Sequence, residues 1–357
     1  MRGGPIVCAL IAISVLAPSP AEAEPRSFWG VSSQTGVGAA DLARMGEAEV
    51  GTLRALFSWS TVEPVPGARD WSAIDAIVAE AAANEIAVLP FLYGTPDWVA
   101  RAFDRRRCAV DCAVYPPRSD AALVSWRRFI GDAVRRYGRG GEFWARHPTL
   151  PKRPIFAWQI WNEQNSPDFF APRISSRNYA RLLDRAAKAI RGANRRAEVI
   201  LGGMAEIAGV SGAKPGWAYL RDLYRRPGAR HDFDGIAPHA YAANVAGVRE
   251  QIAKARRTAR AARDRKATMW ITEIGVASGH GDDPFELGPD GQARHLRKSF
   301  RFLRARRRAL AAEAVVWFSW RDAWTSICAW CPTSGLFDGS YAAKPAFREF
   351  TRFTGGR

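Results

Sequence analysis

The stretch Ile155–Asn165, IFAWQIWNEQN, decides how the rest of the chain is interpreted. It begins as an apolar, aromatic run of strand type and ends abruptly in Asn162-Glu163. A buried strand tolerates a charge only at its end, where the side chain reaches a cleft, and partial desolvation there raises the pKa of a glutamate. Glu163 is therefore a candidate functional carboxyl at a strand terminus.

A second segment has the same form. Thr268–Gly275, TMWITEIG, is an apolar run that places Glu273 near its end, 110 residues after Glu163. Two glutamates at strand ends are typical of a two-carboxylate active site. The alternative is that both are ordinary strand-end acids, which cap helices or pair with arginine. Two such acids, each in an aromatic context, favour the active site.

Short apolar strands alternate with helical segments along the chain and are of the kind that is buried on both faces. The eight expected strands are Phe28–Gln34, Thr52–Ser58, Ala87–Tyr93, Ile155–Trp161, Glu198–Met204, Gly235–Tyr241, Thr268–Ile274 and Ala314–Trp320. Eight strand–helix units predict a single (β/α)₈ TIM barrel, in which chemistry sits at the carboxyl ends of the strands. The polar residues that the pattern brings to that end are Arg54, Asn162, Glu163, His239, Tyr241 and Glu273.

The N-terminus has the features of an export signal. Arg2 supplies the positive region, Ile6–Leu16 the apolar run and Ala21-Glu22-Ala23 a small-x-small cleavage site. We expect residues 1–23 to be removed and residues 24–357 to form the secreted barrel, outside the cell or in the cell envelope. The apolar run is too short for a permanent anchor, so no stable membrane insertion is expected.

Four cysteines follow the signal, in two close pairs. Cys108 pairs with Cys112 and Cys328 with Cys331 if both are short-loop disulfides, as expected in an oxidising compartment. The alternative is a four-thiolate zinc site, since Cys328 and Cys331 have C-x-x-C spacing. The unequal spacing of the two pairs favours disulfides.

The chain carries a net charge of +17, with a sequence pI near 10.3. A basic surface attracts nucleic acid, anionic lipid or acidic polysaccharide. However, the arginines concentrate in Arg249–Arg265 and Arg294–Arg308, spaced as the solvated outer faces of helices. The export signal also counts against a nucleic-acid binder, so no nucleic-acid partner is expected.

Four motifs carry a resemblance to a known group of enzymes: Trp161-Asn162-Glu163-Gln164-Asn165, Trp270-Ile271-Thr272-Glu273-Ile274-Gly275, Pro238-His239-Ala240-Tyr241 and Leu53-Arg54-Ala55-Leu56-Phe57. The chain resembles retaining glycoside hydrolases of clan A, and within the clan it is most similar to the family 39 and family 5 type. Thr61-Val62-Glu63-Pro64, Asp70-Trp71 and Gly94-Thr95-Pro96-Asp97-Trp98 resemble bacterial family 39-like enzymes that act on exopolysaccharide.

This resemblance implies a role for each residue. Glu163 would be the acid/base and Glu273 the nucleophile, with Arg54 and Tyr241 beside Glu273. Asn162 would bind the sugar 2-hydroxyl, and His239 would contact the substrate or a neighbouring side chain. Trp317 would be the sugar platform on the last strand, with Trp320 as the alternative, and Trp59 and Trp98 would stack further sugars. The resemblance implies no cofactor or metal, a polysaccharide or oligosaccharide substrate and a monomer.

Three functions compete at the sequence level. The first is an endo-acting β-glycosidase for a bacterial exopolysaccharide or β-glycan. The second is an exo-acting β-xylosidase-like enzyme. The third is a catalytically silent carbohydrate-binding barrel, which predicts damage to Arg54 or to one of the two glutamates. All three residues are intact.

Overall fold

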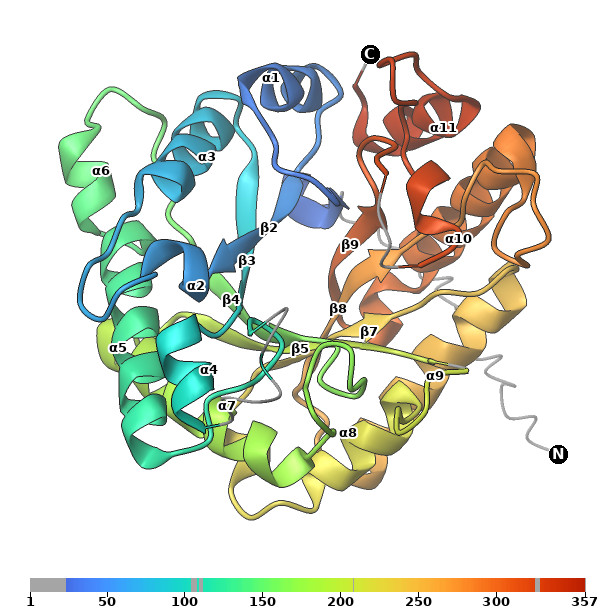
Figure 1. The fold of residues 1–357 in the computed structure, drawn as a ribbon. Coiled ribbons are helices and arrows are strands. Elements are labelled where there is room, and N and C mark those ends of the chain that lie inside the picture. Colours follow the sequence, from blue (N-terminus) through green and yellow to red (C-terminus); the bar gives the residue numbers. More distant parts are fainter. Residues whose placement is uncertain (1–23, 104–107, 109–111, 208, 325–327, 357) are drawn as a thin grey trace, which may run out of the picture.

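The computed structural model describes residues 24–103, 108, 112–207, 209–324 and 328–356, and the predicted export signal lies outside them. Parallel strands form a closed barrel, and helices surround it on the outside (Figure 1). The first strand pairs with both the second and the last, which closes the ring. The predicted (β/α)₈ TIM barrel is confirmed.

The barrel has eight strand positions. They are β1 (Trp29–Ser32), β2 (Thr52–Ser58), β3 (Ala87–Tyr93), β4 (Ala157–Asn162), β5 (Glu198–Ala205), β6 with β7 (Gly235–Ile236 and Pro238–His239), β8 (Thr268–Ile274) and β9 (Ala312–Phe318). The sixth expected strand is interrupted between β6 and β7. Pro238 lacks the N–H that a regular ladder needs, and Tyr241 lies beyond the strand end.

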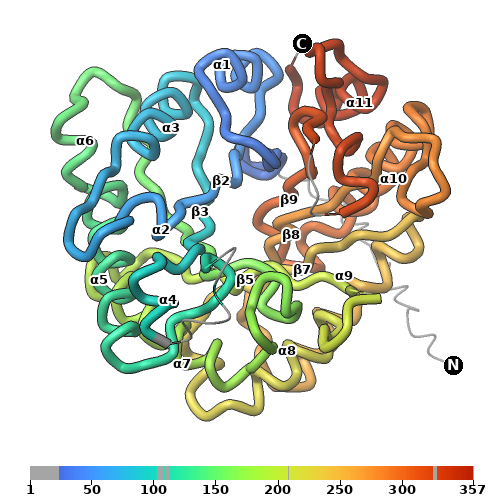
Figure 2. The backbone as a smooth tube through the Cα atoms, in the orientation of Figure 1, coloured from blue at the N-terminus to red at the C-terminus, as the bar shows by residue number. Residues whose placement is uncertain are grey.

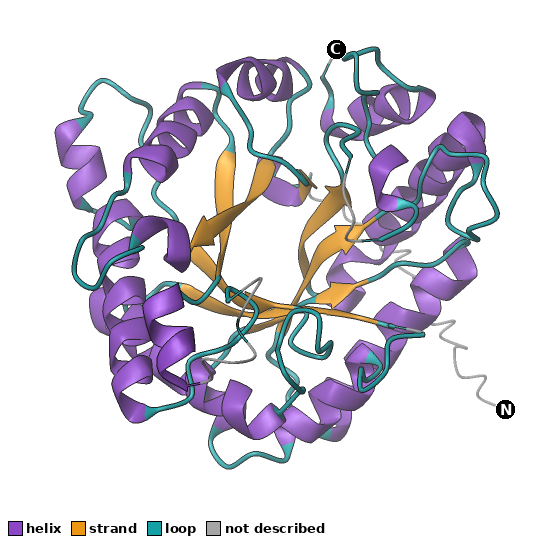
Figure 3. Ribbon diagram, in the orientation of Figure 1, coloured by secondary structure: helices purple, strands orange, loops and turns teal. Residues whose placement is uncertain are grey.

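Helices form the outer layer, as Figure 3 shows by colour. They are α1 (Ala39–Glu47), α2 (Trp59–Val62), α3 (Ser72–Ala83), α4 (Asp97–Phe103), α5 (Asp120–Tyr137), α6 (Glu142–Arg146), α7 (Ser176–Ala193), α8 (Gly216–Tyr224), α9 (Val245–Ala261), α10 (Gly288–Leu310) and α11 (Pro345–Thr354). Ser119 caps α5 by accepting a hydrogen bond from the Ala122 N–H. Among the helices of the described ranges, none is both long enough and apolar enough to cross a bilayer.

The main core lies between the strands and the helices. Trp29 of β1 stacks on Phe300 of α10 with 4.3 Å between the ring centroids, and Trp317 of β9 packs edge-on against the same phenylalanine. Alternation along a strand therefore sends these large rings outward and leaves the barrel interior to other residues. The chain closes on itself near its end, where α11 approaches α1 (Figure 2) and Thr354 Oγ1 donates to the Ala48 carbonyl at 2.6 Å.

Both predicted disulfides form. Cys108 is bonded to Cys112 and Cys328 to Cys331, with Cα–Cα distances of 4.9 and 5.2 Å. Each pair joins residues only four or three positions apart. A short closed loop removes little entropy from the unfolded chain, so each bond stabilises the fold by only about 2 kcal/mol.

We expect the purified protein to carry four fewer hydrogens than its all-thiol form. Peptide mapping should link Cys108 to Cys112 and Cys328 to Cys331. The double variant Cys108→Ser/Cys112→Ser should fold and lose about 2 kcal/mol of unfolding free energy in a denaturant titration. Four free thiols binding one zinc ion would contradict this assignment.

Candidate active site

A buried guanidinium lies at the centre of the candidate site. Arg54, in the middle of β2, is 2% exposed. Its Nη1 donates to Glu273 Oε1 at 2.6 Å, its Nη2 to Asn162 Oδ1 at 2.7 Å and its Nε to Gln159 Oε1 at 2.7 Å. The Phe91 ring lies 4.1 Å from its Cζ. A buried cation is tolerated only when it is paired and hydrogen-bonded, and Arg54 meets both conditions.

Glu273, the penultimate residue of β8, is bound through both carboxylate oxygens. Arg54 binds Oε1, and the Tyr241 hydroxyl donates to Oε2. Burial and the neighbouring Glu273 carboxylate raise the pKa of Tyr241 well above its usual range. Tyr241 therefore keeps its proton and acts as a hydrogen-bond donor. One cation and one neutral donor thus stabilise the negative charge of Glu273.

Glu163 has a different environment. It directly follows β4 with a positive φ of 40°, its N–H donates to the Gly203 carbonyl at 2.8 Å, and its side chain is 13% exposed. The pKa of Glu163 is raised to about 7, chiefly by burial; the Arg54 charge lowers it and the Asp168 charge raises it. A positive φ in a residue other than glycine costs free energy and is concentrated at functional sites. Near neutral pH this carboxyl exchanges its proton readily.

His239 lies between the two carboxylates. Its Nδ1 is 2.7 Å from Glu163 Oε1 and 3.2 Å from Glu273 Oε2. Burial lowers the pKa of His239 to about 4, so the ring is neutral at pH 7. Nε2 has no hydrogen-bond partner among the described residues, and we assign the proton to Nδ1. A Cβ at Gly203 would lie 1.7 Å from Nε2, so β5 needs glycine here to make room for the ring.

The two glutamates are close together. One side-chain oxygen of Glu163, one of Glu273 and a ring nitrogen of His239 all lie within 4.8 Å of one another. Such a trio can hold a metal ion in other proteins. Here both oxygens of Glu273 are already bound by Arg54 and Tyr241, and a guanidinium at 2.6 Å opposes a second cation. The arrangement fits proton transfer and nucleophilic attack better than metal binding.

The structure brings together six residues that the sequence predicted for one site: Arg54, Asn162, Glu163, His239, Tyr241 and Glu273. Sequence reasoning missed Gln159. Its Oε1 accepts from Arg54, while its Nε2 donates to the Leu201 carbonyl and Thr272 Oγ1, both at 3.1 Å. The available signal was a lone amide in the middle of the apolar run of β4.

The predicted sugar platform on the last strand is wrong. Trp317 and Trp320 are both 0% exposed. Trp317 points outward to α10, and the Trp320 Nε1 donates to Asp41 Oδ1 at 3.1 Å. One residue of register decides which face of a strand a side chain occupies, so Phe318 has its ring on the opposite side. It lies 6.0 Å from the Tyr241 ring.

The two tryptophans predicted on the mouth loops differ. Trp59 is fully buried, packs against Trp126 and Phe129, and donates through Nε1 to Glu63 Oε2 at 2.9 Å. The predicted stacking of sugars on Trp59 is therefore wrong. Trp98 is half-buried with its Nε1 bonded to the Glu63 carbonyl at 3.0 Å, and its contact with sugar stays a prediction.

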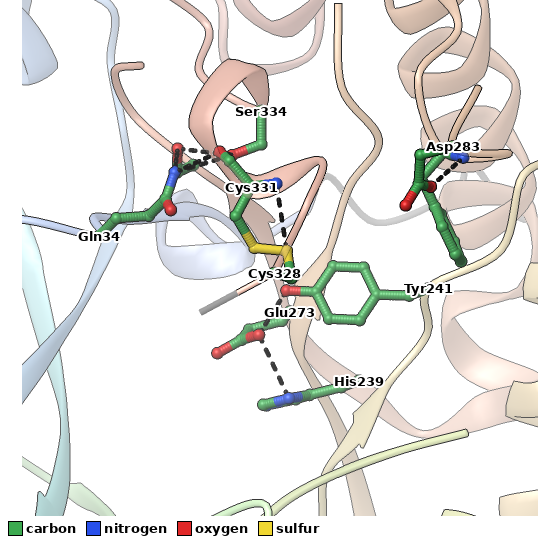
Figure 4. The surroundings of a disulfide bond; sticks show 10 residues. Gln34, His239, Tyr241, Glu273, Asp283, Cys328, Cys331 and Ser334 are labelled. Atoms are coloured by element: carbon green, nitrogen blue, oxygen red, sulfur yellow. Dashed lines mark hydrogen bonds and ion pairs between the residues drawn. A yellow bond between two sulfur atoms is a disulfide. The ribbon is translucent and has the colours of Figure 1, made fainter. Parts of the chain in front are cut away.

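One disulfide lies beside the site. Figure 4 shows Cys328 and Cys331 above Tyr241 and Glu273. Trp330, between the two cysteines, lies 5.1 Å from the Tyr241 ring and stacks on Phe285. Gln34 Nε2 holds the loop by donating a 2.7 Å hydrogen bond to the Cys331 carbonyl. The covalent link therefore braces the aromatic wall that contacts the tyrosine.

Comparisons with known proteins agree with this geometry. The model of glycoside hydrolase family 42, described as beta-galactosidase, matches residues 33–109. A family 39 glycoside hydrolase from Bacteroides cellulosilyticus WH2 matches 93% of the chain with a TM-score of 0.67 and 17% identity. This chain spans 64% of that one. No curated protein matches the sequence.

Two further solved structures have the same fold. The intracellular xylanase TsXylA from Thermoanaerobacterium saccharolyticum JW/SL-YS485 matches with a TM-score of 0.60 and 17% identity, covering 91% of this chain and 95% of its own. A family 5 enzyme from Bifidobacterium longum subsp. longum ATCC 55813 matches with a TM-score of 0.63 and 15% identity, covering 92% and 78%. The predicted resemblance to clan A, and to families 39 and 5 within it, is confirmed.

The raised pKa of Glu163 predicts how stability depends on pH. The folded protein prefers the neutral carboxyl. This preference contributes fully to the free energy of unfolding below pH 4.5, and the contribution is lost as pH rises to about 7. Glu163→Gln does not titrate, so its unfolding free energy relative to wild type should rise between pH 4.5 and 8, by roughly 3 kcal/mol at most. Denaturant titrations across this range measure the difference.

The matched control is Glu47→Gln at the exposed end of α1. Its unfolding free energy relative to wild type should change little over the same pH range. Equal pH dependence in both variants would contradict the assigned pKa of Glu163.

Proposed function

We propose that this chain is a secreted, monomeric β-glycosidase that hydrolyses O-glycosidic bonds with retention of configuration. Glu163 is the acid/base and Glu273 the nucleophile. The observation that carries the proposal is a pair of carboxyls, at the ends of β4 and β8, with oxygens within 4.8 Å of each other. Retaining enzymes hold their carboxyls about 5–5.5 Å apart, whereas inverting enzymes need about 6.5–9.5 Å to admit a water molecule.

The first step requires a proton on the leaving oxygen. Glu163 supplies it, since its pKa of about 7 leaves much of the carboxyl protonated at neutral pH. The neutral His239 donates from Nδ1 to Glu163 Oε1 at 2.7 Å. That hydrogen bond places the transferable proton on Oε2 and orients the carboxyl.

Glu273 attacks C1 as the bond from C1 to the leaving oxygen breaks. Arg54 and Tyr241 hold its carboxylate oxygens in place before attack, so the nucleophile is already oriented. A glycosyl ester between C1 and Glu273 results. Glu163, now ionised, takes a proton from water, whose oxygen attacks C1 and releases Glu273. Asn162, held by Arg54, offers its amide N–H groups to the sugar 2-hydroxyl.

The proposed substrate is a bacterial exopolysaccharide or a β-glycan, cleaved within the chain. Structures of the neighbour TsXylA with glutamate-to-alanine substitutions hold xylotriose or xylotetraose, which supports a site that takes several sugar units. The main alternative is an exo-acting, β-xylosidase-like enzyme. Product analysis distinguishes them, because endo action gives a range of oligosaccharides and exo action gives one small sugar.

Replacing the acid tests the first step. Glu163→Ala should slow alkyl glycosides by about 10²–10⁴-fold and dinitrophenyl glycosides much less, because only the poor leaving group needs a proton. Added azide should restore turnover of the activated substrate and yield a β-glycosyl azide. As a control, Glu47→Ala should keep both rates. Equal losses on both substrates without an azide product would remove Glu163 from this role.

Trapping tests the second step. A 2-fluoro activated glycoside of a sugar that the enzyme accepts should label Glu273, as peptide mass spectrometry would show. NMR of a β-linked substrate should show the β anomer of the product first. Early release of the α anomer would exclude double displacement. Wild-type protein that binds oligosaccharides and cleaves none would instead indicate a silent carbohydrate-binding barrel.

A further inference from the structure

A hollow lies on the outer wall of the barrel between α8 and α9, which run side by side there (Figure 1). Its volume is about 610 Å³. It is lined by Trp217, Arg221, Tyr224, Arg225, Lys254, Arg257, Thr258, Ala261 and Ala262. We call this feature the α8–α9 groove. None of its lining residues belongs to the candidate active site.

Two aromatic rings line the groove. Trp217 and Tyr224 are half-buried and lie two turns apart on α8. Tyr224 is fixed by a 3.0 Å hydrogen bond from its hydroxyl to Asp264. The guanidinium of Arg221 lies 5.4 Å from the Trp217 ring. Partly exposed flat rings in the lining of a hollow offer a stacking surface for the apolar face of a sugar.

The walls of the groove are cationic. Arg221 of α8 and Arg225, the residue that caps its C-terminus, have i, i+4 spacing. Lys254 and Arg257 of α9 have i, i+3 spacing, so each pair shares one helix face. No acidic residue lines the groove. Lys254 pairs with Glu250 at 3.1 Å and Arg225 with Asp222 at 3.5 Å. Arg221 and Arg257 have no carboxylate partner among the described residues.

The basic face of α10 provides a contrast within the same protein. Arg301 and Arg306 are exposed and also have no carboxylate partner in the described part of the chain. Neither of them lines the α8–α9 groove. That face fits the solvated arginines expected from the sequence. The α8–α9 groove differs because its cations and two aromatic rings line the same hollow.

We propose that the α8–α9 groove binds an anionic polysaccharide chain, with carboxylate groups paired to Arg221 and Arg257 and a sugar ring on Trp217. Arginine binds carboxylates through two parallel hydrogen bonds, and the aromatic rings of the lining select a sugar ring over a simple counterion. A lipid surface would need a protruding face, whereas this site is a hollow. The proposal goes beyond the proposed function, since the groove binds the polymer and the barrel mouth cleaves it.

Binding can be measured without turnover, so this test does not depend on the proposed hydrolysis. Immobilised alginate, a polyuronate, is the anionic probe and xylan the neutral one, at 50 mM and 300 mM salt. We expect wild type to bind alginate, more weakly at high salt, and Arg221→Ala/Arg257→Ala to bind it at least tenfold more weakly. Trp217→Ala should also weaken alginate binding without a change of charge.

The control Arg301→Ala/Arg306→Ala removes the same charge from α10 and should stay within twofold of wild type. Equal weakening of both double variants would overturn the proposal in favour of diffuse attraction by the +17 charge. Absence of alginate binding by wild type would also overturn it. Double-stranded DNA that binds as tightly, and loses as much in Arg221→Ala/Arg257→Ala but nothing in Trp217→Ala, would identify a nucleic-acid site instead.

Discussion

The buried guanidinium of Arg54 is the constraint on which the interior of this barrel depends. The Arg54 side chain is 1% exposed and lies in a low dielectric, so each N–H donor that it removes from water needs a hydrogen-bond acceptor in the protein. Glu273 from β8 and Gln159 and Asn162 from β4 supply that compensation. Three strands that are distant in sequence must therefore be in register before the charge is satisfied. Lysine, a point charge without a planar fork, could not bind all three acceptors in this way.

Arg54 also makes the two glutamates unequal. It donates directly to Glu273 and reaches Glu163 only through space. Glu163 has the neutral His239 as its nearest donor and is held by a strained backbone turn after β4. One carboxylate is therefore held by a cation and a neutral donor, while the pKa of the other is raised to about 7. Two identical side chains acquire different chemistry from one asymmetric set of neighbours.

The sequence predicted the barrel well because a strand buried on both faces is a short apolar run with little ambiguity. β2, β3 and β8 begin and end at the predicted residues. Polar residues that follow such runs, such as Glu163, were also placed correctly, since a barrel gathers strand ends at one mouth. Gln159 was missed because an amide inside a strand needs a partner from another strand, Arg54, that a single run does not reveal.

The tryptophans mark the limit of that reasoning. Trp317 and Phe318 are adjacent aromatic residues at the end of β9, and composition cannot say which ring faces the interior. The bulge between β8 and β9 shifts the register near Ile274 and makes simple counting along the strand unreliable. The structure turns Trp317 toward Phe300 and leaves Phe318 beside Tyr241. The large aromatic side chains of this chain therefore pack chiefly between the barrel strands and the surrounding helices.

The packing layer between the strands and the helices explains why the proposed binding groove and the proposed cleavage site can occupy separate parts of one barrel. Chemistry needs side chains from several strands at one mouth, and their positions are fixed by the interior around Arg54. The outer faces of α8 and α9 are not constrained in this way, because only the inner faces of these helices, with residues such as Leu220 and Ile252, are buried. Trp217 and Arg257 could thus be acquired or lost without disturbing the pairing of Arg54 with Glu273. Separate physical constraints therefore leave the outer wall free to hold the anionic polymer that we propose for the α8–α9 groove.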